Sequence, residues 1–346
     1  MRRGGVLLLT TLLLSFSLIF SACSNGDDDS TSYPNPTLPE NQGKNPVDKI
    51  LGENANGNEE GTEKKSIKLN VVPFDGADEE PENYFFELET DGTATYYYNS
   101  DTSIKYPSIE FKYTYNETEK EIYMKVEKLS LGMDNDKPLL FTYKECLSYR
   151  STLKENFIKR EKEDLEHDYE YYSPLEEYPT YNDYEAAYLE KRGYKSFDEM
   201  FDETWKEELY YLERQFSAVI TYKYEIKEEK MTLTEKFTGI KNMLLAECYC
   251  YYDKINIYIY NIFACFEVYN DSENDRIEYY TESLVPFGAD KITFHQYNED
   301  KETGKDIIVD TITAPYKEDL EKEAVLLTIN GKEYTCKFKG NKYIQE

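Results

Sequence analysis

The feature that most constrains the fold is the clean alternation of apolar and polar residues between residues 216 and 237. One set of alternate side chains in the first half is apolar or aromatic: Phe216, Ala218, Ile220, Tyr222, Tyr224 and Ile226. After a short turn at Glu228-Glu229, the pattern returns through Met231, Leu233 and Phe237. Because successive side chains of a strand point to opposite faces, this stretch predicts an antiparallel hairpin with one buried face.

The same period of two recurs on both sides of this hairpin. Apolar residues alternate at 67–71, 84–88 and 109–126, and an Asp91-Gly92 turn joins two of the runs. Aspartate and glycine between alternating runs are a strong hairpin signal. Further strands are predicted at 255–260, 276–284, 291–297, 306–312 and 324–338. An antiparallel β structure therefore accounts for most of the chain.

The apolar spacing becomes helical between about residues 142 and 213. Phe197, Phe201, Trp205 and Leu209 recur every four residues, and Ser196 precedes them as a predicted helix cap. The predicted fold class is mainly β, or α+β by content. It comprises an antiparallel lipocalin-like barrel, or a pair of barrels, with a helical insertion at about 142–213.

A resemblance supports the barrel. The paired runs at 222–227 and 230–234 resemble strands of the small lipocalin-like barrels found on bacterial lipid-anchored proteins, and the hairpin at 88–97 is similar in style. The Gly-x-Trp signature of true lipocalins is absent, because the sole tryptophan, Trp205, lies in the helical insertion. The resemblance implies an up-and-down barrel that can enclose an apolar cup, and it implies no particular ligand.

The amino-terminal residues have the pattern of an export signal. Arg2 and Arg3 precede an apolar run at 6–20, which is shorter than a membrane-spanning helix and ends in small residues before Cys23. This ending resembles the bacterial lipoprotein signal, although Phe20 stands where that family usually has an aliphatic residue. The resemblance implies cleavage before Cys23 and attachment of acyl chains, such as palmitate, to this cysteine. The alternative is an ordinary secretory signal with an incidental cysteine.

Four segments follow from these patterns. Residues 1–22 are the predicted signal peptide, and residues 23–65 are a lipidated cysteine followed by a disordered tether rich in Ser, Asn, Gly and Asp. Residues 66–240 form a β meander or barrel that contains the helical insertion. Residues 241–346 add antiparallel strands, either to the same barrel or as a second β subdomain.

Charge limits the partners. The chain has 40 Lys and Arg against 69 Asp and Glu, a formal charge of -29. Such a protein repels nucleic acid, so no nucleic-acid partner is predicted. Anionic lipid headgroups repel it equally, and membrane attachment is expected only through acyl chains on Cys23. By resemblance to lipoprotein sorting, Ser24 favours the outer membrane or cell surface over the inner membrane.

Few residues have the spacing of a chemical site. The chain has two histidines, His167 and His295, and neither lies in a catalytic or metal-binding motif. We therefore assign no catalytic residue, metal ligand or cofactor. Beyond Cys23, an odd number of cysteines remains, and these are interpreted as buried small side chains, with a zinc site that includes His295 as the weaker alternative. They are Cys146, Cys248, Cys250, Cys265 and Cys336.

Two functions remain open at this point. The preferred one is a non-enzymatic, lipid-anchored envelope protein whose β body binds a small amphipathic ligand or a surface partner, because the chain has an anchor signal and a tether and lacks a catalytic set. Its 35 tyrosines suit sugar stacking or a cavity lining, but tyrosine is also a favoured strand residue that tolerates half-burial, and this structural interpretation is preferred. An apolar barrel cavity would favour the small ligand, and a filled interior would favour a surface role. The alternative is an extracytoplasmic glycan hydrolase with paired carboxylates roughly 5–10 Å apart. Ligand-binding residues and oligomeric state are not assigned.

Overall fold

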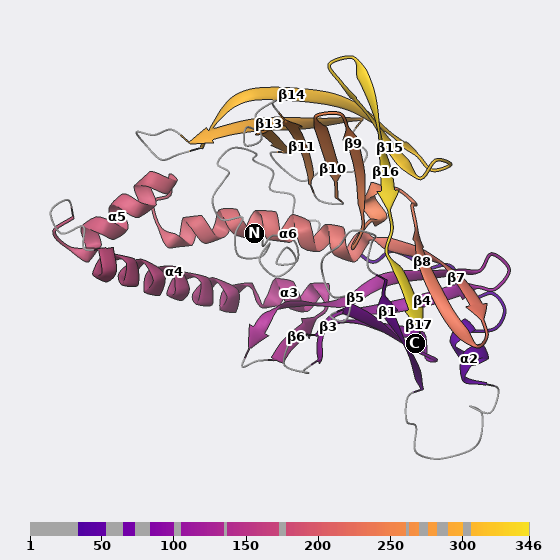
Figure 1. The fold of residues 1–346 in the computed structure, drawn as a ribbon. Coiled ribbons are helices and arrows are strands. Elements are labelled where there is room, and N and C mark those ends of the chain that lie inside the picture. Colours follow the sequence, from indigo (N-terminus) through magenta and orange to yellow (C-terminus); the bar gives the residue numbers. More distant parts are fainter. Residues whose placement is uncertain are drawn as a thin grey trace. The chain divides into compact units, whose positions relative to one another are not determined.

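The computed structural model describes residues 34–52, 65–72, 84–99, 105–134, 137–172, 178–260, 263–269, 276–281, 290–299 and 306–345. The predicted signal peptide and Cys23 lie outside these residues. Among the helices in these ranges, none combines the length and the apolar character needed to cross a membrane. The prediction of a mainly β fold, with a pair of antiparallel barrels and a helical insertion, is confirmed (Figure 1).

The first barrel is a ring of eight antiparallel strands. Their order is β4-β3-β2-β1-β17-β8-β7-β5, and pairing of β4 with β5 closes the ring, while β6 extends it beside β5. The strands are β1 (Ser66–Val71), β2 (Tyr84–Glu89), β3 (Thr93–Asn99), β4 (Lys105–Asn116), β5 (Glu121–Asp134), β6 (Lys137–Phe141), β7 (Val219–Lys227), β8 (Lys230–Lys236) and β17 (Lys342–Gln345).

The second barrel is inserted between β8 and β17 of the first. Its ring order is β10-β11-β12-β13-β14-β15-β16-β9. The strands are β9 (Glu247–Tyr252), β10 (Ile255–Ile259), β11 (Ala264–Tyr269), β12 (Arg276–Thr281), β13 (Lys291–Glu299), β14 (Asp306–Asp319), β15 (Ala324–Ile329) and β16 (Lys332–Lys339). For residues 241–346 the sequence left open whether the strands join the first barrel or form a second one. Both occur: β9 to β16 build a second barrel, and β17 returns to the first.

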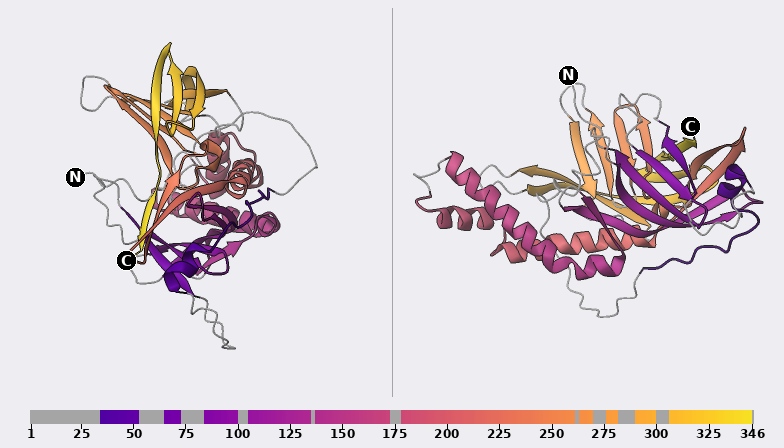
Figure 2. Two further views of the ribbon diagram at one scale, coloured as in Figure 1. Left: turned by 90° about the vertical axis from the view of Figure 1, so that its right-hand side faces the viewer. Right: turned by 90° about the horizontal axis from the view of Figure 1, so that it is seen from below.

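The helical insertion lies between β6 and β7. It contains α3 (Tyr143–Ser148), α4 (Arg150–Tyr172), α5 (Tyr181–Arg192) and α6 (Phe197–Ser217). The predicted cap of α6 is present, because the Ser196 hydroxyl accepts a hydrogen bond from the backbone N–H of Glu199 at 3.2 Å. Phe157 of α4 and Phe201 of α6 have ring centroids 5.6 Å apart, and the two helices lie side by side (Figures 1 and 2).

Part of the predicted tether is ordered, so the prediction of disorder across 23–65 is wrong for residues 34–52. A short helix, α2 (Pro46–Leu51), begins there, and the Asn45 side chain caps it by accepting from the backbone N–H of Val47 at 3.0 Å. The Asn45 amide also donates to the backbone oxygen of Thr90 at 3.1 Å. Val47 is fully buried. A few such contacts with the first barrel order a segment that is too polar to form a core of its own.

Candidate functional site

Aromatic rings from opposite walls fill the middle of the first barrel. Phe86 of β2 has its ring centroid 6.0 Å from that of Tyr222 in β7 and 4.7 Å from that of Tyr343 in β17. Strands β2 and β7 are four positions apart in the ring of eight, so they are opposite walls. All three side chains are fully buried. At this level the barrel is packed with side chains and holds no ligand cup.

A buried carboxyl group lies on the same inward face. Glu235 of β8 alternates with the buried Met231 and Leu233, and its carboxylate accepts hydrogen bonds from the backbone and side-chain nitrogens of Asn341, both at 3.3 Å. Burial raises the pKa of Glu235 to about 7, although the bonds from Asn341 act to lower it. Glu235 is therefore a buried carboxyl group held by Asn341.

Two tyrosine hydroxyls near Glu235 are also buried. Those of Tyr222 and Tyr343 have no hydrogen-bond partner of full geometry among the described residues. Burial raises the pKa of both phenols, and the charges of Glu235 and Tyr96 add to this effect. The interaction between the two phenols raises the pKa of Tyr343 and acts to lower that of Tyr222. Because these hydroxyls are shielded from solvent, they affect the stability of the barrel and are not accessible to a substrate.

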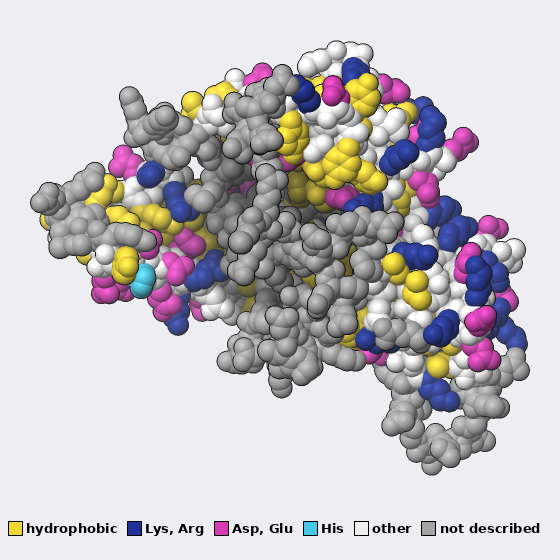
Figure 3. All heavy atoms as spheres, viewed as in Figure 1, with side chains coloured by type: hydrophobic (Ala, Val, Ile, Leu, Met, Phe, Trp, Pro, Cys, Tyr) yellow, Lys and Arg dark blue, Asp and Glu magenta, His cyan; other side chains and the backbone are white. Residues whose placement is uncertain are grey.

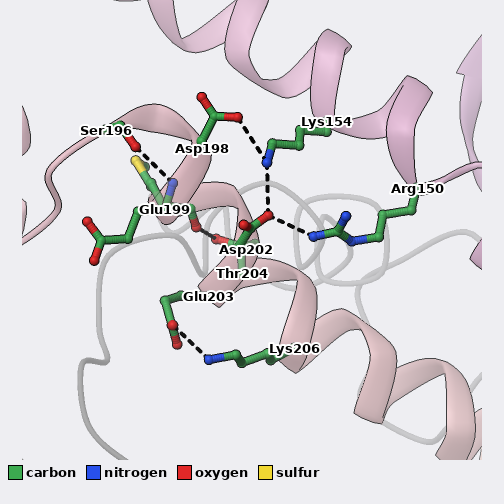
Figure 4. Close-up of polar contacts among 10 residues, drawn as sticks. Arg150, Lys154, Ser196, Asp198, Glu199, Asp202, Glu203, Thr204 and Lys206 are labelled. Carbon is green, nitrogen blue, oxygen red and sulfur yellow. Dashed lines mark hydrogen bonds and ion pairs between the residues drawn. The ribbon is translucent and has the colours of Figure 1, made fainter. Parts of the chain in front are cut away.

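An ion-pair network links α4 to α6 in the helical insertion (Figure 4). Arg150 Nη2 lies 2.7 Å from Asp202 Oδ1, while Lys154 Nζ lies 2.9 Å from Asp198 Oδ1 and 3.1 Å from Asp202 Oδ1. Hydrogen bonds to Asp198 and Asp202 raise the pKa of Lys154. Arg150, Asp198 and Asp202 are exposed, Lys154 is partly buried, and each charge has an opposite partner. The network therefore holds two helices together and offers no unbalanced charge to a ligand.

The strongest candidate for a binding surface is the outer side of the second barrel on β9, β10 and β11. Residues directly opposite on paired strands share a face. The register sets Tyr249 opposite Tyr258 and Tyr251 opposite Asn256, and Asn256 is in turn opposite Glu267. The alternate residues, among them Ile257 and Phe266, belong to the apolar core of the barrel. We call the outward group the tyrosine face: Tyr249, Tyr251, Asn256, Tyr258, Glu267 and Tyr269.

The rings of the tyrosine face contact one another and remain accessible. Tyr251 has its ring centroid 5.2 Å from that of Tyr249 and 5.8 Å from that of Tyr258, to which it is nearly perpendicular at 81°. Tyr251 is 61% exposed and Tyr269 is 36% exposed. Figure 3 shows side chains of the hydrophobic class, which includes tyrosine, gathered over the strands β9 and β10. Exposed neighbouring aromatic rings of this kind are typical of binding surfaces.

A polar group with fixed geometry adjoins these rings. Asn256 donates from Nδ2 to Glu267 Oε2 at 3.3 Å and to the Tyr269 hydroxyl at 3.2 Å, and that hydroxyl donates to Glu267 Oε2 at 2.7 Å. Burial, together with a hydrogen bond to Tyr251, raises the pKa of Tyr258, so this phenol keeps its proton. The face thus combines flat apolar rings with oriented amide, hydroxyl and carboxylate groups.

The structure separates the residues that the sequence had singled out. His167 lies on α4 with its ring stacked near Tyr171, at 6.0 Å, whereas His295 is buried in β13 with Nδ1 2.9 Å from the Thr311 hydroxyl. Within the described ranges, no group of three or more His, Cys, Asp or Glu residues could hold a metal ion. The zinc alternative is therefore not formed there, and Cys23 remains outside the described residues.

The sequence contained part of the signal for the tyrosine face. The run 255–260 has isoleucines on one face and tyrosines beside an asparagine on the other, which already indicates that both sides are covered or used. The contribution of Glu267 and Tyr269 was missed, because only the pairing of β10 with β11 brings them next to Asn256.

Comparison with known proteins does not assign the chain to a family or a function. No protein-family model matches it, and no curated protein or solved structure matches it either. Its function is therefore inferred from its own residues.

Proposed function

We propose that the protein is a lipid-anchored protein of the cell envelope that binds glycan chains on its tyrosine face. Anchoring rests on the signal-like residues 1–22 and on Cys23. The observation that favours a surface role over a small ligand is the contact of Phe86 with Tyr222 across the first barrel, which leaves no cup there.

Glycans fit the chemistry of this face. A sugar ring has an apolar side of C–H groups, which stacks on an aromatic ring, and a rim of hydroxyls, which exchange hydrogen bonds with amides and carboxylates. Tyr251 and Tyr258 supply the rings, while Asn256 and Glu267 supply the polar groups. The formal charge of -29 disfavours strongly anionic polymers, so neutral or basic glycans are expected.

Binding can be measured by affinity electrophoresis and by pull-down with insoluble polysaccharides. Tyr251→Ala and Tyr258→Ala are each expected to weaken binding by about five- to tenfold, since a stacked ring contributes on the order of 1 kcal/mol. The matched control is Tyr171→Ala on α4, a tyrosine that is 74% exposed and does not belong to the tyrosine face. Equal binding by all three variants and the native protein would exclude the tyrosine face as the binding site.

The anchor has a separate test. Mass spectrometry of the native protein is expected to find acyl chains on an amino-terminal Cys23, and Cys23→Ser is expected to release the protein from membranes. Cys146→Ser is the control, because Cys146 is buried in the described structure. Recovery of an unprocessed, unacylated chain would contradict the proposal.

One observation keeps hydrolysis as a second candidate. Glu278 of β12 is directly opposite Glu267, so two carboxylates stand side by side next to the tyrosine face, with Cβ atoms about 5 Å apart by strand geometry. Each accepts a hydrogen bond from a tyrosine two residues along its own strand, Tyr269 or Tyr280. If this pair is catalytic, Glu267→Gln and Glu278→Gln will each abolish release of reducing sugar ends, and Glu278→Gln, which lies outside the tyrosine face, will leave glycan binding intact. Absence of any release by the native protein would leave binding alone.

A further inference from the structure

Two cysteines face each other across the seam that closes the second barrel. Strands β9 and β16 are the first and last strands of this barrel in the sequence, and their pairing completes the ring. The register sets Tyr249 opposite Lys337 and Cys248 opposite Phe338. Continued by one pair, it sets Cys250 of β9 directly opposite Cys336 of β16.

Both side chains point into the barrel. Cys336 belongs to the apolar core, and Cys250 packs against the same core. Directly opposite residues of antiparallel strands have Cα atoms about 4.5–5.5 Å apart, a separation that a disulfide bond can span. The other cysteines of this barrel are placed differently. Cys248 is opposite Phe338, with its sulfur 3.6 Å from Met243 Sδ, and Cys265 is on the outer face opposite Tyr258.

The pair lies one layer below the end of the barrel. Tyr252 and Tyr334, the next inward positions on β9 and β16, have ring centroids 6.0 Å apart, and the Lys332 ammonium lies 3.7 Å from the Tyr252 ring centroid. Tyr252 is 51% exposed, so the rings at this end of the barrel border the solvent. Cys250 is partly exposed beneath it, and Cys336 is fully buried. A dissolved reagent therefore reaches Cys250 first.

The two thiols also differ in acidity. A hydrogen bond from the Cys336 thiol, which outweighs the effect of burial, lowers the pKa of Cys250 to about 7, and the nearby charge of Lys332 adds to this effect. The same hydrogen bond, together with burial, raises the pKa of Cys336. At neutral pH, Cys250 is thus partly a thiolate and is the nucleophile of the pair, since the thiolate is the reactive form.

We propose that Cys250 and Cys336 are an oxidation site, at which exchange with a small-molecule or protein disulfide forms a bond that locks β9 to β16. In the first step, the Cys250 thiolate attacks one sulfur of the donor disulfide, and the other donor sulfur leaves as a thiolate that takes up a proton. The negative charge that raised the pKa of Cys336 is then gone.

The second step completes the exchange. Cys336 gives its proton to solvent and attacks the Cys250 sulfur, and the second donor sulfur leaves as a thiolate and is protonated. The protein has lost two electrons and two protons, and the donor has become two thiols. The new bond joins the first and last strands of the barrel, so it holds closed the seam on which the ring and the tyrosine face depend.

The test uses the full chain, purified under reducing conditions and then treated with oxidised glutathione. After alkylation of the remaining thiols, peptide mapping is expected to show a Cys250–Cys336 linked peptide and no loss of the other thiols. Cys336→Ala is expected to stop at glutathione bound to Cys250, and Cys265→Ala is expected to behave as the native protein. Counting the thiols of the native protein before and after oxidation tests the proposal without any substitution. Circular dichroism verifies that the variants are folded.

The pH profile gives a second readout. Because the pKa of Cys250 is about 7, the rate at which Cys250 of the native protein reacts with glutathione is expected to be about tenfold higher at pH 8 than at pH 6 and to level off above pH 8. The same rate in Cys336→Ala measures Cys250 without the hydrogen bond from Cys336. Retention of all thiols by the folded native protein, under conditions that oxidise the unfolded chain, would overturn the proposal. A bond from Cys250 to any cysteine other than Cys336 would overturn it as well.

Discussion

Replacement of Glu235 by glutamine tests whether the interior of the first barrel holds a protonated carboxyl group. Glu235 is only 5% exposed, and burial raises its pKa from 4.5 to about 7. The folded protein therefore binds this proton more tightly than the unfolded chain does. The contribution to stability is complete below about pH 4.5, decreases as the pH rises, and is lost above about pH 7.

The magnitude follows from the size of the shift. A change of 2.5 pKa units, from 4.5 to about 7, corresponds to about 3 kcal/mol of folding free energy. Glutamine is neutral at every pH and keeps an oxygen that can accept from Asn341. The new amide hydrogens carry their own desolvation cost, but that cost does not change with pH. Relative to the native protein, Glu235→Gln should therefore gain about 2–3 kcal/mol between about pH 5 and about pH 8.

The assay must report on the first barrel alone, because a chain with two barrels does not unfold in one step. Hydrogen exchange of peptides that cover β8 measures local opening, and peptides from the second barrel serve as an internal reference. Comparison of variant and native protein at the same pH cancels the intrinsic exchange rate. The control is Glu225→Gln on β7, an exposed glutamate beside Lys227, for which the difference should stay constant over this range. A constant difference for Glu235→Gln as well would show that Glu235 is ionised in the folded protein and refute the reasoning.

Further predictions concern the same barrel and are measured by the same hydrogen exchange of first-barrel peptides. Tyr222→Phe removes a buried hydroxyl that makes no well-formed hydrogen bond among the described residues. The free energy of unfolding should therefore fall by less than about 1 kcal/mol, or increase. Phe86→Ala removes the ring that joins opposite walls and should cost about 3–5 kcal/mol. Burial acts to raise the pKa of Glu121, but hydrogen bonds, first of all from Lys223, lower it to about 2. The stabilisation is therefore present above about pH 4.5 and lost as the pH falls towards 2, so Glu121→Gln should destabilise the protein near neutral pH and progressively less in acid.

Strands and helices were predictable where the pattern is local. The alternation at 216–237 predicts β7 and β8, and the spacing of four from Phe197 to Leu209 predicts α6. In both cases the side chains that decide the structure are close in the sequence, so the period shows which face is buried. The ordered segment 34–52 was missed for the opposite reason, since Asn45 is held by Thr90, a residue far along the chain.

The sequence by itself determined the elements of this protein: the mainly antiparallel β character, the helical insertion, the excess of tyrosine and the acidic charge. Only the tertiary structure decided which strands are neighbours. It placed β17 between β1 and β8, so that the strands of the second barrel are inserted in the sequence between two strands of the first. It also filled the first barrel with rings from opposite walls and brought the Cys336 thiol within hydrogen-bond reach of Cys250. The physical reason is that the backbone groups of a strand edge are the same in every strand, so a period shows a buried face but does not name the partner.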